Sequence, residues 1–365
     1  MSDYLLAFCL LLVVAMVFYV FWDKLTRKVR QPQTSTLYTE ALRDLLDGRQ
    51  ETAFTKLRQV VTQDSANLDA YLRLGRILRE HNQPARALQV HKDLTLRREL
   101  PRDAKVGILR EIALDAVAVE DVSMAEDALR ETIALESDNY WAHTQLLKLL
   151  EKAQRWGEAY DTAAHLLRLE ANKSKKPLAR FKLQEAEQLF RKREYHKARV
   201  LYKEAIGLDP ALERAYLAIG DSYYEEKRLE DAVTFWTKMI SAVPDRGHLV
   251  IDRLKKTFYE LGRFGDIQGI CEIILEHSPR NLEARLALAE FYEKKGDMEQ
   301  AVELLERVVE DHPQETLGVL ELIRVYLERG DSRKVSMLVK SLSKRLEDQQ
   351  RKSAEATSTP AGAQV

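Results

Sequence analysis

The sequence has 365 residues and carries 57 Lys and Arg against 58 Asp and Glu, so its formal net charge is −1. This balance argues against a nucleic-acid-binding protein, for which we expect a basic excess or a basic stripe with stacking aromatic residues. With 14 Gly, 9 Pro and 32% charged residues, the chain has few helix breakers and many residues suited to the wet faces of helices. The composition therefore favours an all-α fold.

An apolar segment follows the short N-terminal end, residues 1–3. No charged residue occurs from Tyr4 to Trp22, and a helix of that length rises roughly 28 Å, about the thickness of a bilayer core. A signal peptide would have basic residues before the apolar run and a small-x-small cleavage site after it. Here Asp3 precedes the run, and its end is aromatic, with Phe18, Tyr19, Phe21 and Trp22. We therefore predict an uncleaved transmembrane anchor over residues 4–22.

The next segment, residues 23–36, is predicted to be a basic juxtamembrane linker. Its four closely spaced cations are Lys24, Arg27, Lys28 and Arg30. The positive-inside rule places the chain after the anchor in the cytoplasm. These side chains either set the topology only, which is the simpler interpretation, or also bind anionic lipid head groups.

Small or apolar residues recur at nearly one period through the rest of the chain. They are Ala53, Ala87, Ala125, Ala159, Ala198, Ala232, Ile267, Ala301 and Val335. Their spacing of 34 to 39 residues is the period of tetratricopeptide (TPR) repeats, in which each unit is a helix, a turn and a second helix. We predict nine such units forming one solenoid over residues 37–347.

Other positions of the repeat recur in phase with the small residue. Tyr216, Gly220 and Tyr223 precede Ala232, and Trp236 follows it. A small residue at a helix crossing lets two backbones approach, while larger side chains fill the space beside it. Four prolines, which cannot continue a helix, close successive units: Pro210, Pro244, Pro279 and Pro313.

Two stretches depart from the regular array. The longer intervals after Ala87 and Ala159 indicate insertions, and the second insertion contains the basic residues Lys173, Lys175 and Lys176. This loop is either simply solvated or a contact for a partner or lipid. At the other end, residues 348–365 are small and polar, which predicts a disordered tail.

The inventory of reactive residues argues against an enzyme. Cys9 lies inside the predicted anchor, and Cys271 takes a core position of a second helix. Neither cysteine has a partner at zinc-ligand spacing, and the chain has no phosphate loop, no H-E-x-x-H pair and no nucleophile elbow. His91 lies at a packing position, where a hydrogen-bonded histidine is expected. We predict no catalytic residue, no cofactor and no metal site.

A TPR array binds other proteins on the concave surface lined by the first helix of each unit. The repeat frame predicts which residues face this groove: Leu72, Arg76 and Arg79 in the second unit, Leu217, Asp221 and Tyr224 in the sixth, and Leu286, Glu290 and Glu293 in the eighth. The two arginines are candidates to bind a partner carboxylate, whereas the acidic eighth unit favours a basic segment. Self-association into a homo-oligomer stays open.

The arrangement of anchor, basic stop and nine cytoplasmic TPR units resembles the lipopolysaccharide assembly protein B family, which are membrane-anchored adaptors of Gram-negative bacteria. The second unit, residues 70–94, matches best, through the pattern R-A-x-x-x-H-x-x-L at Arg86, Ala87, His91 and Leu94. The resemblance covers about the first 345 residues. It implies a protein of the bacterial inner membrane that regulates lipopolysaccharide synthesis by presenting the lipid A deacetylase to the membrane protease FtsH.

One feature of that family is missing from this sequence. Its members end in a rubredoxin-like metal domain with two C-x-x-C pairs, and this chain has only two cysteines in all. No metal site is therefore carried over. Either this is a divergent member that works without the metal, or the anchored solenoid is shared and the client differs. A separate alternative to the adaptor is a passive scaffold at the inner membrane, which would organise an envelope or secretion assembly without delivering a client for degradation.

Overall fold

A computed structural model describes residues 15–16, 18 and 34–358 of the chain. The regular secondary structure of these residues is entirely helical, in agreement with the predicted all-α fold. Within the described part, no helix combines the length and the apolar character that crossing a bilayer requires. Apart from Ala15, Met16 and Phe18, the predicted anchor over 4–22 lies outside the described residues, and so do Lys24, Arg27, Lys28 and Arg30.

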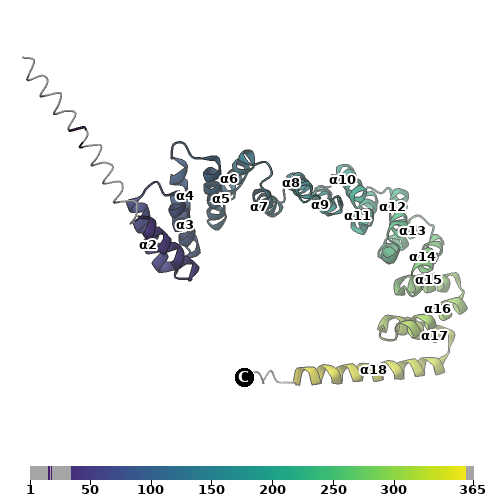
Figure 1. The fold of residues 1–365 in the computed structure, drawn as a ribbon. Helices are drawn as coiled ribbons and strands as arrows, with labels where there is room; N and C mark the ends of the chain where they lie inside the picture. Colours follow the sequence, from purple (N-terminus) through teal and green to yellow (C-terminus); the bar gives the residue numbers. More distant parts are fainter. Residues whose placement is uncertain (1–14, 17, 19–33, 359–365) are drawn as a thin grey trace, which may run out of the picture. The chain divides into compact units, whose positions relative to one another are not determined.

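The chain divides into two units, Met1–Lys173 and Ser174–Val365. The sequence predicts a single array, and the division falls in the exposed basic loop that the long interval after Ala159 produces. The described part of the N-terminal unit holds four helical pairs packed in chain order (Figure 1). They are a helix over residues 34–46 with α2 (Gln50–Gln63), α3 (Leu68–Glu80) with α4 (Pro84–Thr95), α5 (Arg102–Ala118) with α6 (Val122–Leu135), and α7 (Tyr140–Lys152) with α8 (Trp156–Leu169).

The described part of the C-terminal unit holds five further pairs and two short 3-10 helices (Figure 1). Its elements are η1 (Lys176–Leu178), α9 (Ala179–Arg191), α10 (Tyr195–Leu208), α11 (Glu213–Glu225), α12 (Leu229–Ala242), η2 (Pro244–Val250), α13 (Ile251–Glu260), α14 (Asp266–His277), α15 (Leu282–Lys295), α16 (Met298–Asp311), α17 (Thr316–Arg329) and α18 (Ser332–Ser358). Each of the four predicted closing prolines comes directly after the second helix of a pair or its cap residue.

Each pair turns through one residue with a positive φ angle. These residues are Gly48, Asn82, Glu120, Gln154, Arg193, Lys227, Gly262, Gly296 and Gly330. Every one of them stands five positions before the small residue of its unit. Gly296, at φ +88°, ends α15 in the left-handed conformation that glycine adopts without steric cost. Gly296 and Asp297 therefore form the turn between α15 and α16.

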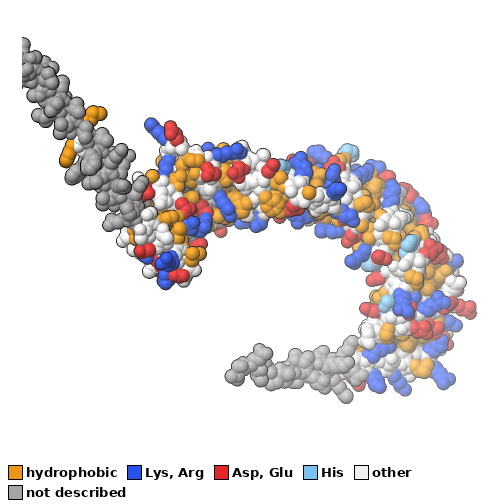
Figure 2. Space-filling view, viewed as in Figure 1, with side chains coloured by type: hydrophobic (Ala, Val, Ile, Leu, Met, Phe, Trp, Pro, Cys, Tyr) orange, Lys and Arg blue, Asp and Glu red, His pale blue; other side chains and the backbone are white. Residues whose placement is uncertain are grey.

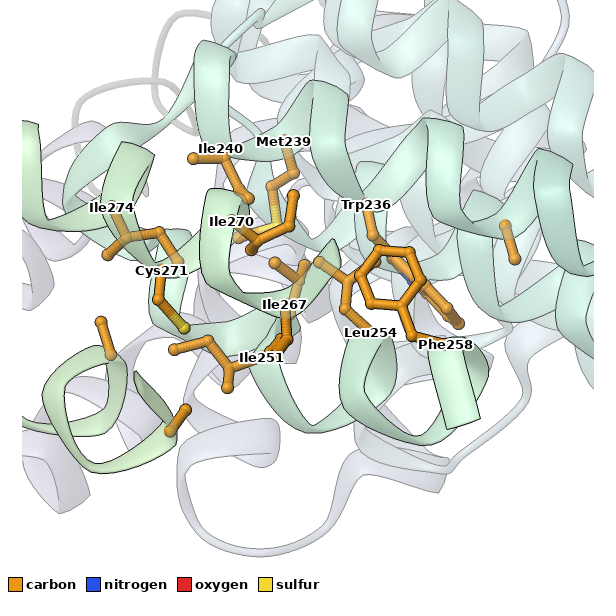
Figure 3. Close-up of a cluster of buried hydrophobic side chains, with 14 of the residues drawn as sticks. Trp236, Met239, Ile240, Ile251, Leu254, Phe258, Ile267, Ile270, Cys271 and Ile274 are labelled. Atoms are coloured by element: carbon orange, nitrogen blue, oxygen red, sulfur yellow. The ribbon is translucent and has the colours of Figure 1, made fainter. Parts of the chain in front are cut away.

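The small residues lie where the two helices of a pair pack together. The first eight, from Ala53 to Ala301, are 0% exposed, and Val335 in the last pair is half-buried. In the C-terminal unit they join a continuous core in which side chains of α12, α13 and α14 point toward one another (Figure 3). Trp236, Phe258 and Cys271 are members of this core. Lys, Arg, Asp and Glu are interspersed over the outside (Figure 2).

The end of the chain differs from the predicted disordered tail over 348–365. Helix α18 continues to Ser358, and residues 359–365 lie outside the described residues. The stretch after Glu347 contains Ala354 and Ala356 and has no Gly or Pro before Ser358, so helix propensity favours its continuation.

Candidate protein-binding groove

In the N-terminal unit, the two predicted arginines are engaged within the chain. Arg76 Nη2 donates to Glu111 Oε1 at 2.6 Å. Arg79 donates to Glu111 Oε2 at 2.8 Å and to Asp115 Oδ1 at 2.6 Å. Both carboxylates are on α5, and each is less than 5% exposed. The arginines therefore link α3 to α5, the first helix of the next pair.

His91 completes this buried network. Its Nδ1 lies 2.5 Å from Asp115 Oδ2 and its Nε2 lies 3.2 Å from the backbone oxygen of Leu72. Both ring nitrogens therefore lie beside oxygen atoms of the fold. The ring lies directly over Gly75, where a Cβ atom would overlap it. The predicted hydrogen-bonded packing role of His91 is confirmed.

The network makes the stability of the N-terminal unit depend on pH. Burial works to raise the pKa of Glu111, but hydrogen bonds from Arg76 and Arg79 outweigh it, and the pKa lies below its ordinary value. A lowered carboxyl pKa stabilises the fold fully above the unfolded-state pKa, about 4.3, and this stabilisation is lost as the pH falls through the folded-state value. We therefore expect Glu111→Gln to lower the melting temperature at pH 7, and we expect this deficit to shrink as the pH falls below the unfolded-state value of about 4.3.

Thermal melts of the full chain at pH 7, 5 and 3.5, followed by circular dichroism, measure this difference. Asp127→Asn is the control, because Asp127 is exposed on α6 and makes no ion pair in the described part of the chain. A Glu111→Gln deficit of equal size at all three pH values would contradict the assignment.

The predicted residues of the sixth unit also bind within the fold. Asp221 accepts two hydrogen bonds from Arg253 of α13, at 2.7 and 3.1 Å. The hydroxyl of Tyr224 donates to Glu260 at the end of α13. The backbone oxygen of Leu217 accepts from the indole nitrogen of Trp236 at 3.3 Å. These contacts hold α11 to α12 and α13.

The predicted residues of the eighth unit, in contrast, line a groove. It has a volume of about 560 Å³ and lies among η2, α13, α15, α16 and α17 of the C-terminal unit. Leu286, Glu290 and Glu293 of α15 all contribute to it. Its full lining is His248, Ile251, Asp252, Lys255, Glu283, Leu286, Ala287, Ala289, Glu290, Glu293, Lys294, Leu305, Leu317, Glu321 and Arg324.

The charges of the groove fall into two linked groups. Lys255 and Lys294 both donate to Glu290. Burial works to raise the pKa of Glu290, but these two hydrogen bonds outweigh it and hold the pKa below its ordinary value. In the second group, Arg324 of α17 donates to Glu293 at 2.7 Å. The hydrogen bond with Glu293 raises the pKa of the Arg324 guanidinium.

Two further carboxylates of the groove, Asp252 and Glu283, make no ion pair with any described residue. The lining thus has five carboxylates and three Lys and Arg side chains, an excess of two negative charges when His248 is neutral. This agrees with the acidic character predicted for the eighth unit.

Sequence reasoning missed part of this groove. It did not single out Asp252 of α13, or Leu317, Glu321 and Arg324 of α17. A signal for the cross-links was present, because opposite charges stand about one repeat apart. Lys255 and Glu290 are separated by 35 positions, and Glu293 and Arg324 by 31. Such pairs face each other when successive repeats stack in register.

Three further features that the sequence singles out are the buried cysteine, the predicted absence of a metal site and the basic loop. Cys271 is 0% exposed, and burial raises the pKa of its thiol to about 12, so it stays protonated near neutral pH. The described residues contain no group of three or more His, Cys, Asp or Glu side chains placed to hold a metal ion. In the basic loop, Lys176 Nζ lies 3.6 Å from Asp209, while Lys173 and Lys175 are exposed.

Comparison with known proteins identifies the repeats. Tetratricopeptide-repeat family models match residues 183–245 and 258–318. A crystal structure of a tetratricopeptide repeat protein from Parabacteroides merdae covers 80% of this chain and 98% of its own, with 12% identity and a TM-score of 0.36.

The chain is also similar to lipopolysaccharide assembly protein B over most of its length. It is 22% identical to that protein of Escherichia coli over 344 residues, which is 92% of this chain and 88% of the relative. It is 24% identical to the Haemophilus influenzae protein over 233 residues, 63% of this chain and 58% of the relative. The resemblance predicted from the sequence is confirmed: the chain is similar to lipopolysaccharide assembly protein B over most of its length, and two stretches of it match tetratricopeptide-repeat models.

Proposed function

We propose that this protein is a non-catalytic adaptor at the bacterial inner membrane, whose repeats hold a client protein on the cytoplasmic side. The observation that carries the proposal is the similarity to lipopolysaccharide assembly protein B over 92% of the chain. The charge-free run from Tyr4 to Trp22 and the cations after it support a membrane anchor. The groove among α13, α15 and α17 offers a surface for protein binding.

The adaptor regulates lipopolysaccharide synthesis through the stability of its client. From the family resemblance, we propose that the client is the lipid A deacetylase and that the receiving protease is FtsH. TPR repeats bind segments of other proteins and bring them together, and the chain needs no active site for this task.

Deleting the gene should lengthen the half-life of the deacetylase, because the protease then meets its substrate without help. Pulse-chase labelling in the deleted strain measures this, with the full-length gene as the restoring control. A version lacking residues 1–30 should fail to restore rapid turnover. An unchanged half-life, together with cross-links from the full chain to envelope or secretion components, would identify a passive scaffold instead.

A further inference from the structure

The groove of the C-terminal unit has negative charge that its own cations do not neutralise. Lys255 and Lys294 are held by Glu290, and Arg324 is held by Glu293 and Glu321. Asp252 and Glu283 have no cationic partner among the described residues. An acidic ligand would have to break existing pairs, whereas a basic ligand finds two carboxylates ready to accept hydrogen bonds.

The same groove also has an apolar part. Leu286, Ala287, Ala289 and Leu305 line it from α15 and α16, and Leu317 lines it from α17. The side chain of Leu317 is 53% exposed although it belongs to a helix whose opposite face is in the core. Covering this leucine with an aliphatic side chain removes apolar surface from water and favours binding.

We propose that this groove binds a basic protein segment in which Lys or Arg side chains alternate with aliphatic ones along a helix. The cations pair with Asp252 and Glu283, and an aliphatic side chain contacts Leu286 and Leu317. The inference rests on the proposed function, since it takes this segment to belong to the client. It adds the chemistry by which the client is recognised and the place where it binds.

Fluorescence anisotropy with labelled peptides tests the groove on the full chain in mild detergent. The probe is a synthetic 14-residue helix that presents Lys, Arg and Leu side chains together on one face, and its control has Glu at every Lys and Arg position. We expect the basic peptide to bind and the acidic one not to bind, with affinity falling as NaCl rises from 50 to 300 mM. Equal binding of both peptides, or of neither, would overturn the proposal.

Charge-neutralising variants locate the site. Asp252→Asn combined with Glu283→Gln should weaken binding of the basic peptide by about fivefold, the loss of two solvent-accessible ion pairs. The matched control is Glu213→Gln combined with Glu299→Gln. These two carboxylates also lie in first turns of helices, make no ion pair in the described part of the chain and are outside the groove. Equal weakening by both double variants would place the peptide elsewhere.

A second matched pair tests the apolar part. Leu317→Ser should weaken binding about threefold, whereas Leu327→Ser should leave it unchanged. Leu327 is 60% exposed on the same helix but does not line the groove. If the full chain instead sediments as a dimer that Asp252→Asn with Glu283→Gln dissociates, the groove holds a second copy and the proposal fails.

The two proposals fail in different experiments. Peptide binding by purified protein does not depend on turnover in the cell, so an unchanged deacetylase half-life after gene deletion removes the adaptor role alone. Loss of the difference between basic and acidic peptides removes the groove assignment alone, and the adaptor role then needs another surface.

Discussion

Trp236→Ala should destabilise the C-terminal unit by about 4 kcal/mol, the cost of truncating a large buried aromatic side chain. Trp236 is 1% exposed in the core formed by α12, α13 and α14 (Figure 3). Its ring lies over the backbone of α11, where Gly220 leaves room for it, and its indole nitrogen donates to Leu217. The substitution therefore removes apolar contacts, leaves a cavity and breaks a hydrogen bond.

Urea titration of the full chain, followed by circular dichroism, measures this loss, with Tyr259→Ala as the control. Tyr259 is 78% exposed on α13, so its truncation should change the free energy of unfolding by less than about 0.5 kcal/mol.

The packing over Gly220 has its own test, because a Cβ there would lie 2.2 Å from the indole nitrogen. Gly220→Ala should be costly with Trp236 present and nearly neutral in a Trp236→Leu background. Equal costs in both backgrounds would refute this account.

Asp115→Ala should destabilise the N-terminal unit by about 3 to 5 kcal/mol, the usual cost of removing one partner from a buried ion pair. Asp115 is 0% exposed and serves both Arg79 and His91. Without it, His91 is left beside an empty space, and Arg79 keeps only Glu111.

Thermal and urea unfolding of the full chain measure the effect, and Asp127→Ala on exposed α6 is the matched substitution. We expect it to change stability by less than about 0.5 kcal/mol. Adding His91→Leu to Asp115→Ala should recover part of the loss, because it removes the unpaired polar ring and keeps its volume. If Asp115→Ala unfolds like the unchanged chain, the network contributes no net stability.

The helical framework is predictable because it depends on local and periodic features. Ala232 and its counterparts mark the crossing of each helical pair, and Pro244 and Pro279 mark where pairs end. The turns within the pairs are harder to predict from the residue types. Lys227 and Arg193, for example, adopt a positive φ angle, and neither is the glycine that usually indicates such a turn. Their place is set by packing of the flanking helices, which overrides residue preference.

The interactions of the groove residues are less predictable from the sequence. The repeat frame gives the face on which Arg76 or Asp221 lies, but not whether its charge meets solvent or the adjacent repeat. That depends on how far one pair is rotated against the next, which the period alone does not fix. As a result, the sequence predicts that Arg76 and Arg79 bind a partner protein, whereas in the structure both pair with Glu111 of the same chain. In the eighth unit, by contrast, Glu290 and Glu293 line a groove of the structure.

The cross-links between successive first helices also restrict how this protein can change during evolution. Replacing Arg253 by an acidic residue would place two carboxylates next to each other. The fold would tolerate this change only if Asp221, 32 positions away, were replaced by a basic residue. In natural variants, the two residues of such an ion pair, about one repeat apart, should therefore change together. A single-residue insertion within a helix would rotate every later side chain of that helix by about 100° around the helix axis. The rotation would separate the paired charges. Length changes are expected to accumulate instead in the loops between units, as in the basic loop at Lys173.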